Sequence, residues 1–144
     1  MPENVISDLS TSECQQLLDD HHFGRLAFID HAEAVPVIVP VNYLTRRGKV
    51  VFRTDPGAKF TAALGGEPVA FEVDGVHEQE RVGWSVVVVG RVEEVTDAEE
   101  IDELRETPLM PWAPGAKAHF VRVEPDRLSG RRISVADLPS HWWG

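Results

Sequence analysis

Short runs rich in apolar and β-branched residues, bounded by turn residues, occupy the middle of the chain and predict strands separated by short turns. The predicted strands cover residues 25–30, 35–44, 49–54, 68–74, 84–95 and 119–123, with 129–133 continuing the last strand after a break. Pro36 and Pro40 cannot donate to a sheet ladder, so the second strand should lie at an edge or contain a bulge. The valine run from Val86 to Val89 indicates a fifth strand that is buried on both faces.

Helical spacing of apolar residues is confined to short stretches. The predicted helices cover residues 9–20, 58–64 and 97–106. Ser10 with Glu13, and Asp97 with Glu100, have the spacing of capping signals at the start of the first and third helix. Because long crossover helices between the strands are missing, the pattern disfavours a doubly wound parallel sheet. The sequence therefore predicts a mainly β protein, a small six-stranded antiparallel barrel with short helices.

The chain length of 144 residues fits a single domain over 1–144, with a core at about 9–133 and a C-terminal tail at 134–144. The formal net charge of −10 repels phosphate backbones, which argues against nucleic-acid binding. An anionic ligand would need a local basic pocket. The apolar runs are far shorter than the roughly 20 residues that span a bilayer, and the N-terminus lacks signal-peptide features, so we expect a cytoplasmic protein without a membrane partner.

The first candidate site is the segment from Val50 to Lys59, where a strand is followed by a glycine turn and a predicted helix. The start of a helix favours anions, Arg53 can bind a phosphate with two hydrogen bonds, and Lys59 adds a charge. Thr54 offers a hydroxyl group. The alternative is an ordinary strand, turn and helix with solvated cations.

A second candidate is the proline-containing strand around Val39–Tyr43, where backbone groups without ladder partners can bind a planar heterocycle and Asn42 supplies an amide. The alternative is an edge strand with a protective proline. Trp84 and Ser85 open the long strand, although a core position is the commoner one for tryptophan. Trp112 lies in a proline-rich loop that can anchor an interface.

Other reactive side chains show no catalytic or metal-binding spacing. The six histidines are scattered, so no metal site is predicted. Cys14 is the single cysteine, which excludes an intramolecular disulfide. It lies on the apolar face of the first predicted helix, and we interpret it as an inert, buried thiol. No side chain is identified as a general acid or base.

Several segments, in order from about Leu9 to Ile133, resemble the pyridoxamine 5′-phosphate oxidase-like flavin-binding proteins. They are GRLAF (24–28), PVNY (40–43), VFRT (51–54) followed by Gly57 and Lys59, VAFEVD (69–74), and GWSV (83–86) followed by Gly90. The later segments PWAPG (111–115) and GRRI (130–133) resemble the actinobacterial-type branch. The resemblance implies a split β-barrel of the kind that binds FMN between the two subunits of a homodimer.

The resemblance also implies a set of cofactor contacts. The flavin phosphate would lie near Arg53, Thr54 and Lys59, and the ring along the backbone of residues 39–42. Trp84, Ser85 and Val86 would line the cofactor, and Trp112 would come from the partner subunit or support the interface. The complete set of candidates is Val39, Pro40, Val41, Asn42, Phe52, Arg53, Thr54, Lys59, Trp84, Ser85, Val86 and Trp112.

The leading functional hypothesis is an FMN-dependent oxidoreductase that acts on a small molecule. The resemblance does not assign the substrate, because pyridoxamine phosphate oxidases are longer and carry a basic C-terminal substrate signature. One alternative is a reductase that uses the deazaflavin F420. Its long anionic tail needs a basic groove, for which Arg46, Arg47 and Lys49 are available, whereas the net charge argues against it. Another alternative is a non-enzymatic module that binds flavin or haem.

Overall fold

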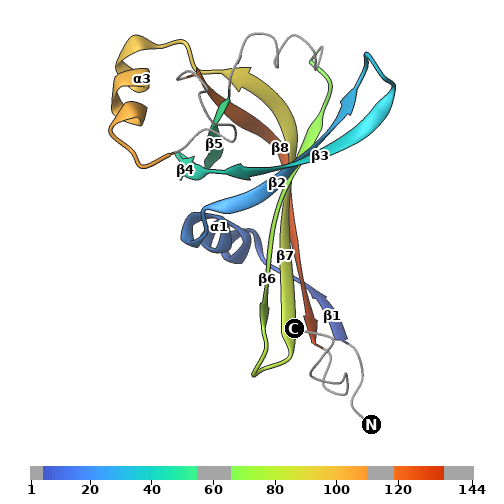
Figure 1. Ribbon diagram of the computed structural model, residues 1–144. Helices are drawn as coiled ribbons and strands as arrows, with labels where there is room; N and C mark the ends of the chain where they lie inside the picture. Colours follow the sequence, from blue (N-terminus) through green and yellow to red (C-terminus); the bar gives the residue numbers. More distant parts are fainter. Residues whose placement is uncertain (1–4, 55–65, 110–118, 135–144) are drawn as a thin grey trace.

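The computed structural model describes residues 5–54, 66–109 and 119–134, and these form one antiparallel sheet with two helices (Figure 1). The strands are β1 (Val5–Asp8), β2 (Phe23–Asp30), β3 (Val35–Asn42), β4 (Leu44–Arg46), β5 (Lys49–Thr54), β6 (Val69–His77), β7 (Val82–Glu94) and β8 (His119–Ser134). The helices are α1 (Thr11–Asp20) and α3 (Ala98–Arg105).

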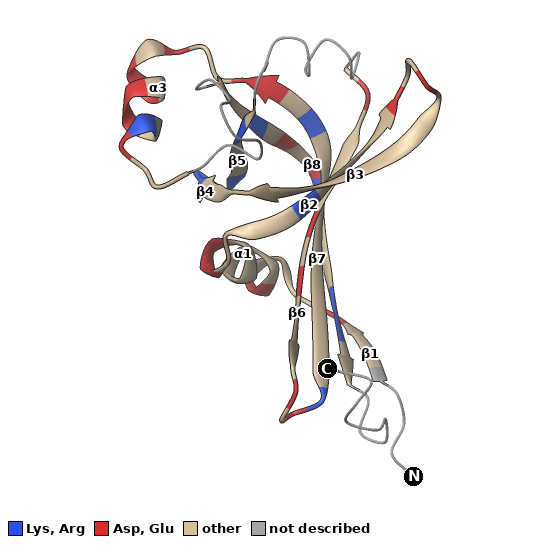
Figure 2. Ribbon diagram, in the orientation of Figure 1, with Lys and Arg blue, Asp and Glu red and all other residues tan. Residues whose placement is uncertain are grey.

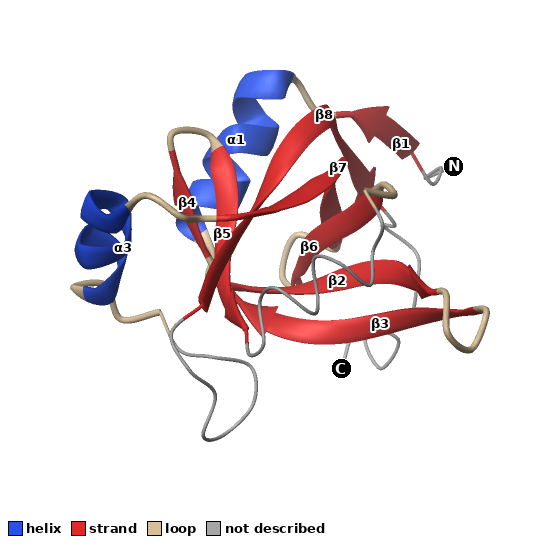
Figure 3. Cartoon of the chain, turned by 90° about the horizontal axis from the view of Figure 1, so that it is seen from above, coloured by secondary structure: helices blue, strands red, loops and turns tan. Residues whose placement is uncertain are grey.

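The strand order in the sheet is β3-β2-β6-β7-β8-β5-β4, and β1 pairs with the distal half of β8. The two ends of the sheet curve towards each other until β3 contacts β5 (Figure 3), which gives the barrel-like half of the molecule, at the top in Figure 1. The other halves of β6, β7 and β8 extend from the barrel as a ribbon that β1 widens (Figure 1). The protein is therefore a half-barrel with a long sheet extension.

The predicted mainly β, antiparallel fold is confirmed, but the sheet has eight strands rather than six. β1 lies before the first predicted element. β4 is separate from β3 because the chain leaves the β2 ladder at Tyr43, whose N–H donates to the His22 carbonyl over 2.9 Å. The expected break in the last strand is also wrong. β8 runs without interruption, and its pairing with β7 instead shifts register between Val89 and Gly90.

The valine run does not have two buried faces in the single chain, contrary to the sequence prediction. Val86 and Val88 are buried, whereas Val87 and Val89 are only partly buried. Successive side chains of a strand point to opposite faces, and only one face of β7 is covered by α1 and the barrel core. We call the face that points away from α1 the outer face.

Both helices begin as their capping signals predict. The Ser10 hydroxyl accepts from Glu13 N–H, and the Glu13 carboxylate accepts from Ser10 N–H. The Asp97 side chain caps α3 by accepting from Glu100 N–H. Helix α1 packs on the barrel core, whereas α3 closes a second cluster formed by Val51, Val95, Leu104, Leu109 and Phe120. The helix expected at 58–64 lies outside the described residues.

Cys14 has the inert position that its place in the sequence indicates. Its side chain is fully buried, and a Cβ on Gly130 of β8 would lie only 2.6 Å from its sulfur. Burial raises the pKa of the thiol, and the neighbouring Glu13 carboxylate raises it further. A thiol that is both buried and protonated has little nucleophilic character.

Tyr43 joins α1 to the barrel. Its buried hydroxyl donates to the Leu18 carbonyl at the end of α1 over 2.7 Å, and burial raises the pKa of the phenol. Tyr43→Phe should lower the free energy of unfolding by about 1–3 kcal/mol, because the Leu18 carbonyl then stays buried without that donor. Urea denaturation measures the change. As a control, Thr45→Val removes an exposed hydroxyl that donates to Asp19, and it should lower the free energy of unfolding by less. Equal losses of stability in the two variants would contradict this role of Tyr43.

Candidate functional site

The end of β5 separates the predicted phosphate contacts onto two sides of the sheet. Phe52 and Thr54 are buried on the same side as the barrel core residue Val50, whereas Arg53 points to the opposite side. Lys59, the third predicted phosphate contact, lies outside the described residues, as does Trp112. Of the predicted phosphate contacts, Arg53 and Thr54 can thus be placed, and both lie at the point where β5 ends.

Arg53 is held by the chain that follows α3. Its Nη1 donates to the Leu109 carbonyl over 3.1 Å, and its guanidinium carbon lies 5.1 Å from the centre of the Phe120 ring. Its Nε atom is buried without a hydrogen-bond partner among the described residues. A buried donor without a partner can donate to an acceptor that approaches it, such as a phosphate oxygen.

The proline-containing strand β3 lies at the edge of the sheet, as predicted. It pairs only with β2, so the backbone groups on its other edge have no ladder partners in the sheet. Val41 is buried in the core, while Pro40 and Asn42 are exposed. The register with β2 places Pro40 opposite Arg25 and Asn42 opposite Phe23.

A hollow of about 490 Å³ lies between the end of β3 and the segment that follows α3. We call it the β3 hollow, and its lining residues are His22, Asn42, Tyr43, Leu44, Thr107, Pro108 and Leu109. Arg53 binds the carbonyl of Leu109, one of these residues. The fold therefore brings Asn42 and Arg53, which come from the two candidate segments, into the neighbourhood of Leu109.

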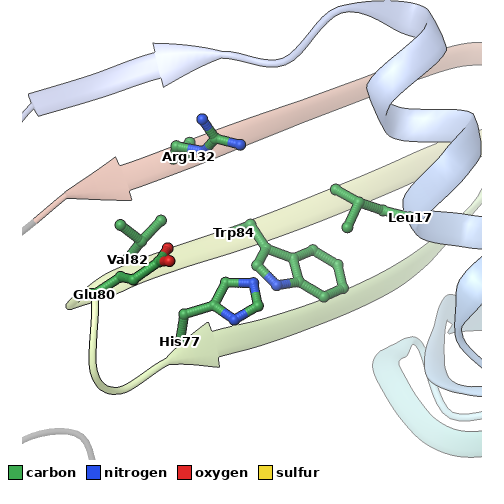
Figure 4. Close-up of a pocket in the computed structure, with 6 residues that line it drawn as sticks. All are labelled: Leu17, His77, Glu80, Val82, Trp84 and Arg132. Carbon is green, nitrogen blue, oxygen red and sulfur yellow. The ribbon is translucent and has the colours of Figure 1, made fainter.

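Trp84 and Ser85, predicted to contact the same ligand, point to opposite faces of β7. Trp84 is buried on the α1 side, where its ring centre lies 4.7 Å from that of His21. It borders a hollow of about 190 Å³ with Leu17, His77 and Arg132, shown in Figure 4. Ser85 lines a separate hollow on the outer face. Trp84 therefore lies in the core, which was the alternative to a cofactor contact, and Val86 is buried in the same cluster.

Sequence analysis missed a charge cluster on the outer face of β2 and β6. Arg25 Nη1 lies 3.3 Å from Glu72 Oε1 and 3.5 Å from Asp74 Oδ2. The pKa of Glu72 is raised to about 7. Partial burial is the main cause and the nearby Asp74 adds to it, whereas Arg25 acts in the opposite direction. The alternation of β6 put both acids on one face, but their proximity to Arg25 depends on the pairing of β6 with β2.

A basic hollow of about 510 Å³ lies on the same face, two strands away. Its lining includes Arg127, Ser129 and Arg131 from β8 and Ser85 from β7. The two arginines are exposed, and none of the ion pairs found among the described residues involves them. Figure 2 shows basic positions on β8 and acidic positions on β6 in the sheet extension. Arg127 and Arg131 are four residues apart, an even spacing that places both on one face of a strand, so the sequence would have indicated this cluster if residues 127–131 had been predicted as strand.

The outer face also carries exposed apolar side chains around these charges. Ile38 is 71% exposed and Ile29 is 46% exposed, and they border an apolar hollow of about 350 Å³ together with Ala27 and Ala70. Contiguous apolar surface of this kind is typical of an interaction site.

Among the described residues, no group of three or more His, Cys, Asp or Glu side chains has a geometry that could hold a metal ion. None of the described helices combines the length and hydropathy that a membrane span requires.

The topology and the open β3 edge define a small split-barrel protein. The family model described as pyridoxamine 5′-phosphate oxidase matches residues 10–132, so the chain belongs to this family. The resemblance seen in the sequence is thereby confirmed.

Relatives and solved structures agree with this family. The uncharacterized protein Rv0080 of Mycobacterium tuberculosis is 37% identical over 92% of this chain and 88% of its own length. A structure described as the FAD binding protein from Mycobacterium smegmatis is 31% identical, covers 90% of this chain and 99% of its own, and has a TM-score of 0.72. A structure from Corynebacterium glutamicum is 30% identical, covers 91% and 100% of the two chains, and has a TM-score of 0.78.

Proposed function

We propose that the protein is a flavin-dependent oxidoreductase that binds FMN at the interface of a homodimer and acts on a small molecule. The observation that carries the proposal is that the end of β3 and the end of β5 both reach Leu109: Asn42 lines the same hollow as Leu109, and Arg53 donates to the Leu109 carbonyl. Support for a flavin comes from the related protein of Mycobacterium smegmatis, which is described as FAD binding.

The residues at this place fit the two parts of a flavin nucleotide. The unpaired backbone edge of β3 and the Asn42 amide offer donors and acceptors to a planar heterocycle. Arg53 has a buried Nε without a described partner, so it suits a phosphate group that Lys59 would also contact, whereas the Thr54 side chain is buried on the other side of β5. The flavin supplies hydride or electron transfer, whereas the protein positions it and controls its surroundings.

A homodimer is supported by the exposed apolar side chains of the outer face. Ile38, Phe23 and Ile29 are large, and each is more than 40% exposed in the single chain. Closed dimers bury such surfaces by placing the same patch of two copies together. Val87 and Val89, half of the valine run, would then also become buried.

FAD is a second candidate cofactor. The related structures from Mycobacterium smegmatis and Mesorhizobium loti, 31% and 26% identical to this chain, are both described as FAD-binding proteins. The larger anionic part of FAD needs additional cations, and Arg127 and Arg131 on the outer face can supply them. F420 remains the deazaflavin alternative.

The direct test is the visible spectrum of freshly purified protein, followed by acid release and mass measurement of any bound flavin. The stripped protein is then titrated with FMN, FAD and F420, and the flavin-loaded protein is mixed anaerobically with nicotinamide donors and, separately, with a reduced deazaflavin donor. We expect FMN to bind most tightly and to be reduced. If FAD or F420 binds more tightly than FMN, that molecule replaces FMN as the proposed cofactor. If none of the three binds, the flavin proposal is overturned. Bound flavin that neither nicotinamide nor deazaflavin donors reduce would indicate a binding module.

A further inference from the structure

The charges on the outer face are arranged on the two sides of one strand. Glu72 and Asp74 stand on β6, Arg127 and Arg131 stand on β8, and β7 lies between them. The residues of β7 that share this face in the same rows, namely Ser85, Val87 and Val89, carry no charge. A negative stripe and a positive stripe therefore flank an uncharged central stripe.

The strand registers align the two stripes row by row. Glu72 pairs with Val87, which pairs with Ser129, the residue midway between the two arginines. Asp74 pairs with Ser85, which pairs with Arg131. Since neighbouring strands are about 4.8 Å apart, the acids and the bases are separated by about 10 Å across the sheet.

We propose that two copies of the chain pack through their outer faces with the two-fold axis along β7, so that Glu72 and Asp74 meet Arg127 and Arg131 of the partner subunit. The inference rests on the homodimer of the proposed function and specifies its geometry. A rotation of 180° about an axis along β7 exchanges the two sides of that strand. It carries β6 of one copy over β8 of the other, and the same contact occurs twice.

The alignment of the rows across β6, β7 and β8 then determines which residues of the two copies meet. Glu72 lies opposite Ser129 of the partner subunit, within reach of both flanking arginines, and Asp74 lies opposite Arg131 of the partner subunit. Val87 lies beside the axis and meets its own copy, which puts apolar side chains at the centre of the interface. A two-fold axis perpendicular to the strands would instead place β6 over β6 and bring the carboxylates together, which like-charge repulsion disfavours.

The environment of Glu72 gives this contact a dependence on pH. In the single chain the pKa of Glu72 is raised to about 7. Arg25 from β2 and Asp74 from β6 are the charged groups that face it, while its β7 neighbour Val87 has no charge. Arginines of the partner subunit favour the carboxylate and lower this pKa, so dimerisation releases a proton. The dimer should therefore be tighter above pH 7 and weaken as the pH falls through 7.

A charge exchange tests the geometry. One variant carries Glu72→Arg and Asp74→Arg, and the other carries Arg127→Glu and Arg131→Glu. Each variant alone places like charges together at both contacts, so its dimer dissociation constant should rise about tenfold or more. An equimolar mixture of the two variants has opposite charges at both contacts and should form a heterodimer, and one chain with all four changes should form a homodimer again. Sedimentation velocity measures each state.

The controls separate this inference from the homodimer itself. Circular dichroism confirms that each variant is folded, and Asp102→Arg with Arg105→Glu makes the same kinds of change on the exposed side of α3. A wild-type chain that is monomeric would overturn the homodimer and this inference together. A dimeric wild type with variants that remain fully dimeric, or with a mixture that does not form heterodimers, would overturn the β7 axis alone. Glu72→Gln should flatten the pH dependence around 7, and an unchanged profile would contradict the role of Glu72.

Discussion

Replacing Phe71 by alanine should lower the free energy of unfolding by about 3–5 kcal/mol. Phe71 is fully buried at the centre of the sheet on β6, and its ring lies 4.8 Å from that of Tyr43. The packing around it is close, since a Cβ on Gly24 would lie only 2.5 Å from Phe71 Cζ. Truncation removes the aromatic surface and leaves a cavity between β2, β6 and Tyr43. Denaturant and thermal unfolding both measure the loss.

Phe23→Ala is the matched control, because it makes the same chemical change on the neighbouring strand β2. Phe23 is 54% exposed, so its truncation should cost much less in a monomeric sample. A larger effect of Phe23→Ala at high protein concentration than at low concentration would reflect burial in the homodimer. Similar losses for the two variants under dilute conditions would contradict the assignment of Phe71 to the core.

Arg53→Ala and Lys59→Ala should each weaken flavin binding by about 10-fold to 150-fold. Each substitution removes a charge-assisted contact to the flavin phosphate, and contacts of this kind are worth about 1.5–3 kcal/mol. Fluorescence titration of the stripped protein with FMN measures the dissociation constants. Riboflavin, which lacks the phosphate, should bind the wild type and the two variants with similar affinity.

Lys49→Ala is the control for the loss of positive charge. Lys49 begins β5, five residues before Thr54, and its ammonium group lies 2.6 Å from Glu124. Its removal should leave FMN affinity unchanged. Unchanged affinity in both Arg53→Ala and Lys59→Ala would overturn the phosphate-site assignment, whereas loss with Lys49→Ala would indicate an extended basic groove of the kind that F420 requires.

The chemistry of Arg53 shows where sequence reasoning reached its limit. The alternation of β5 predicts that Arg53 and Thr54 point to different sides of a strand, but it does not say what lies on each side. Leu109 and Phe120, the residues that hold the guanidinium, are distant in sequence and approach β5 only through the pairing of β5 with β8 and the docking of the segment after α3. Trp84 and Ser85 likewise point to opposite faces of β7, and the tertiary structure decides that Trp84 faces α1 and that Ser85 lines a hollow on the outer face.

The sequence by itself determined the local features of this protein. Hydrogen bonds between residues three positions apart define the start of α1 and α3, so Ser10 with Glu13 and Asp97 with Glu100 could be recognised directly. Proline cannot donate to a ladder, so the sequence predicted that β3 lies at an edge or contains a bulge. Ordered motifs along most of the chain identified the family, and the single cysteine excluded an intramolecular disulfide.

Only the tertiary structure decided how distant residues meet. The opposition of Glu72 and Asp74 to Arg127 and Arg131 follows from the pairing of β6 and β8 on the two sides of β7. The β3 hollow likewise requires the end of β3 and the segment after α3 to lie together. Strand register and sheet order depend on the packing of the complete core, because many pairings satisfy the same local alternation and only burial of all apolar faces together selects one.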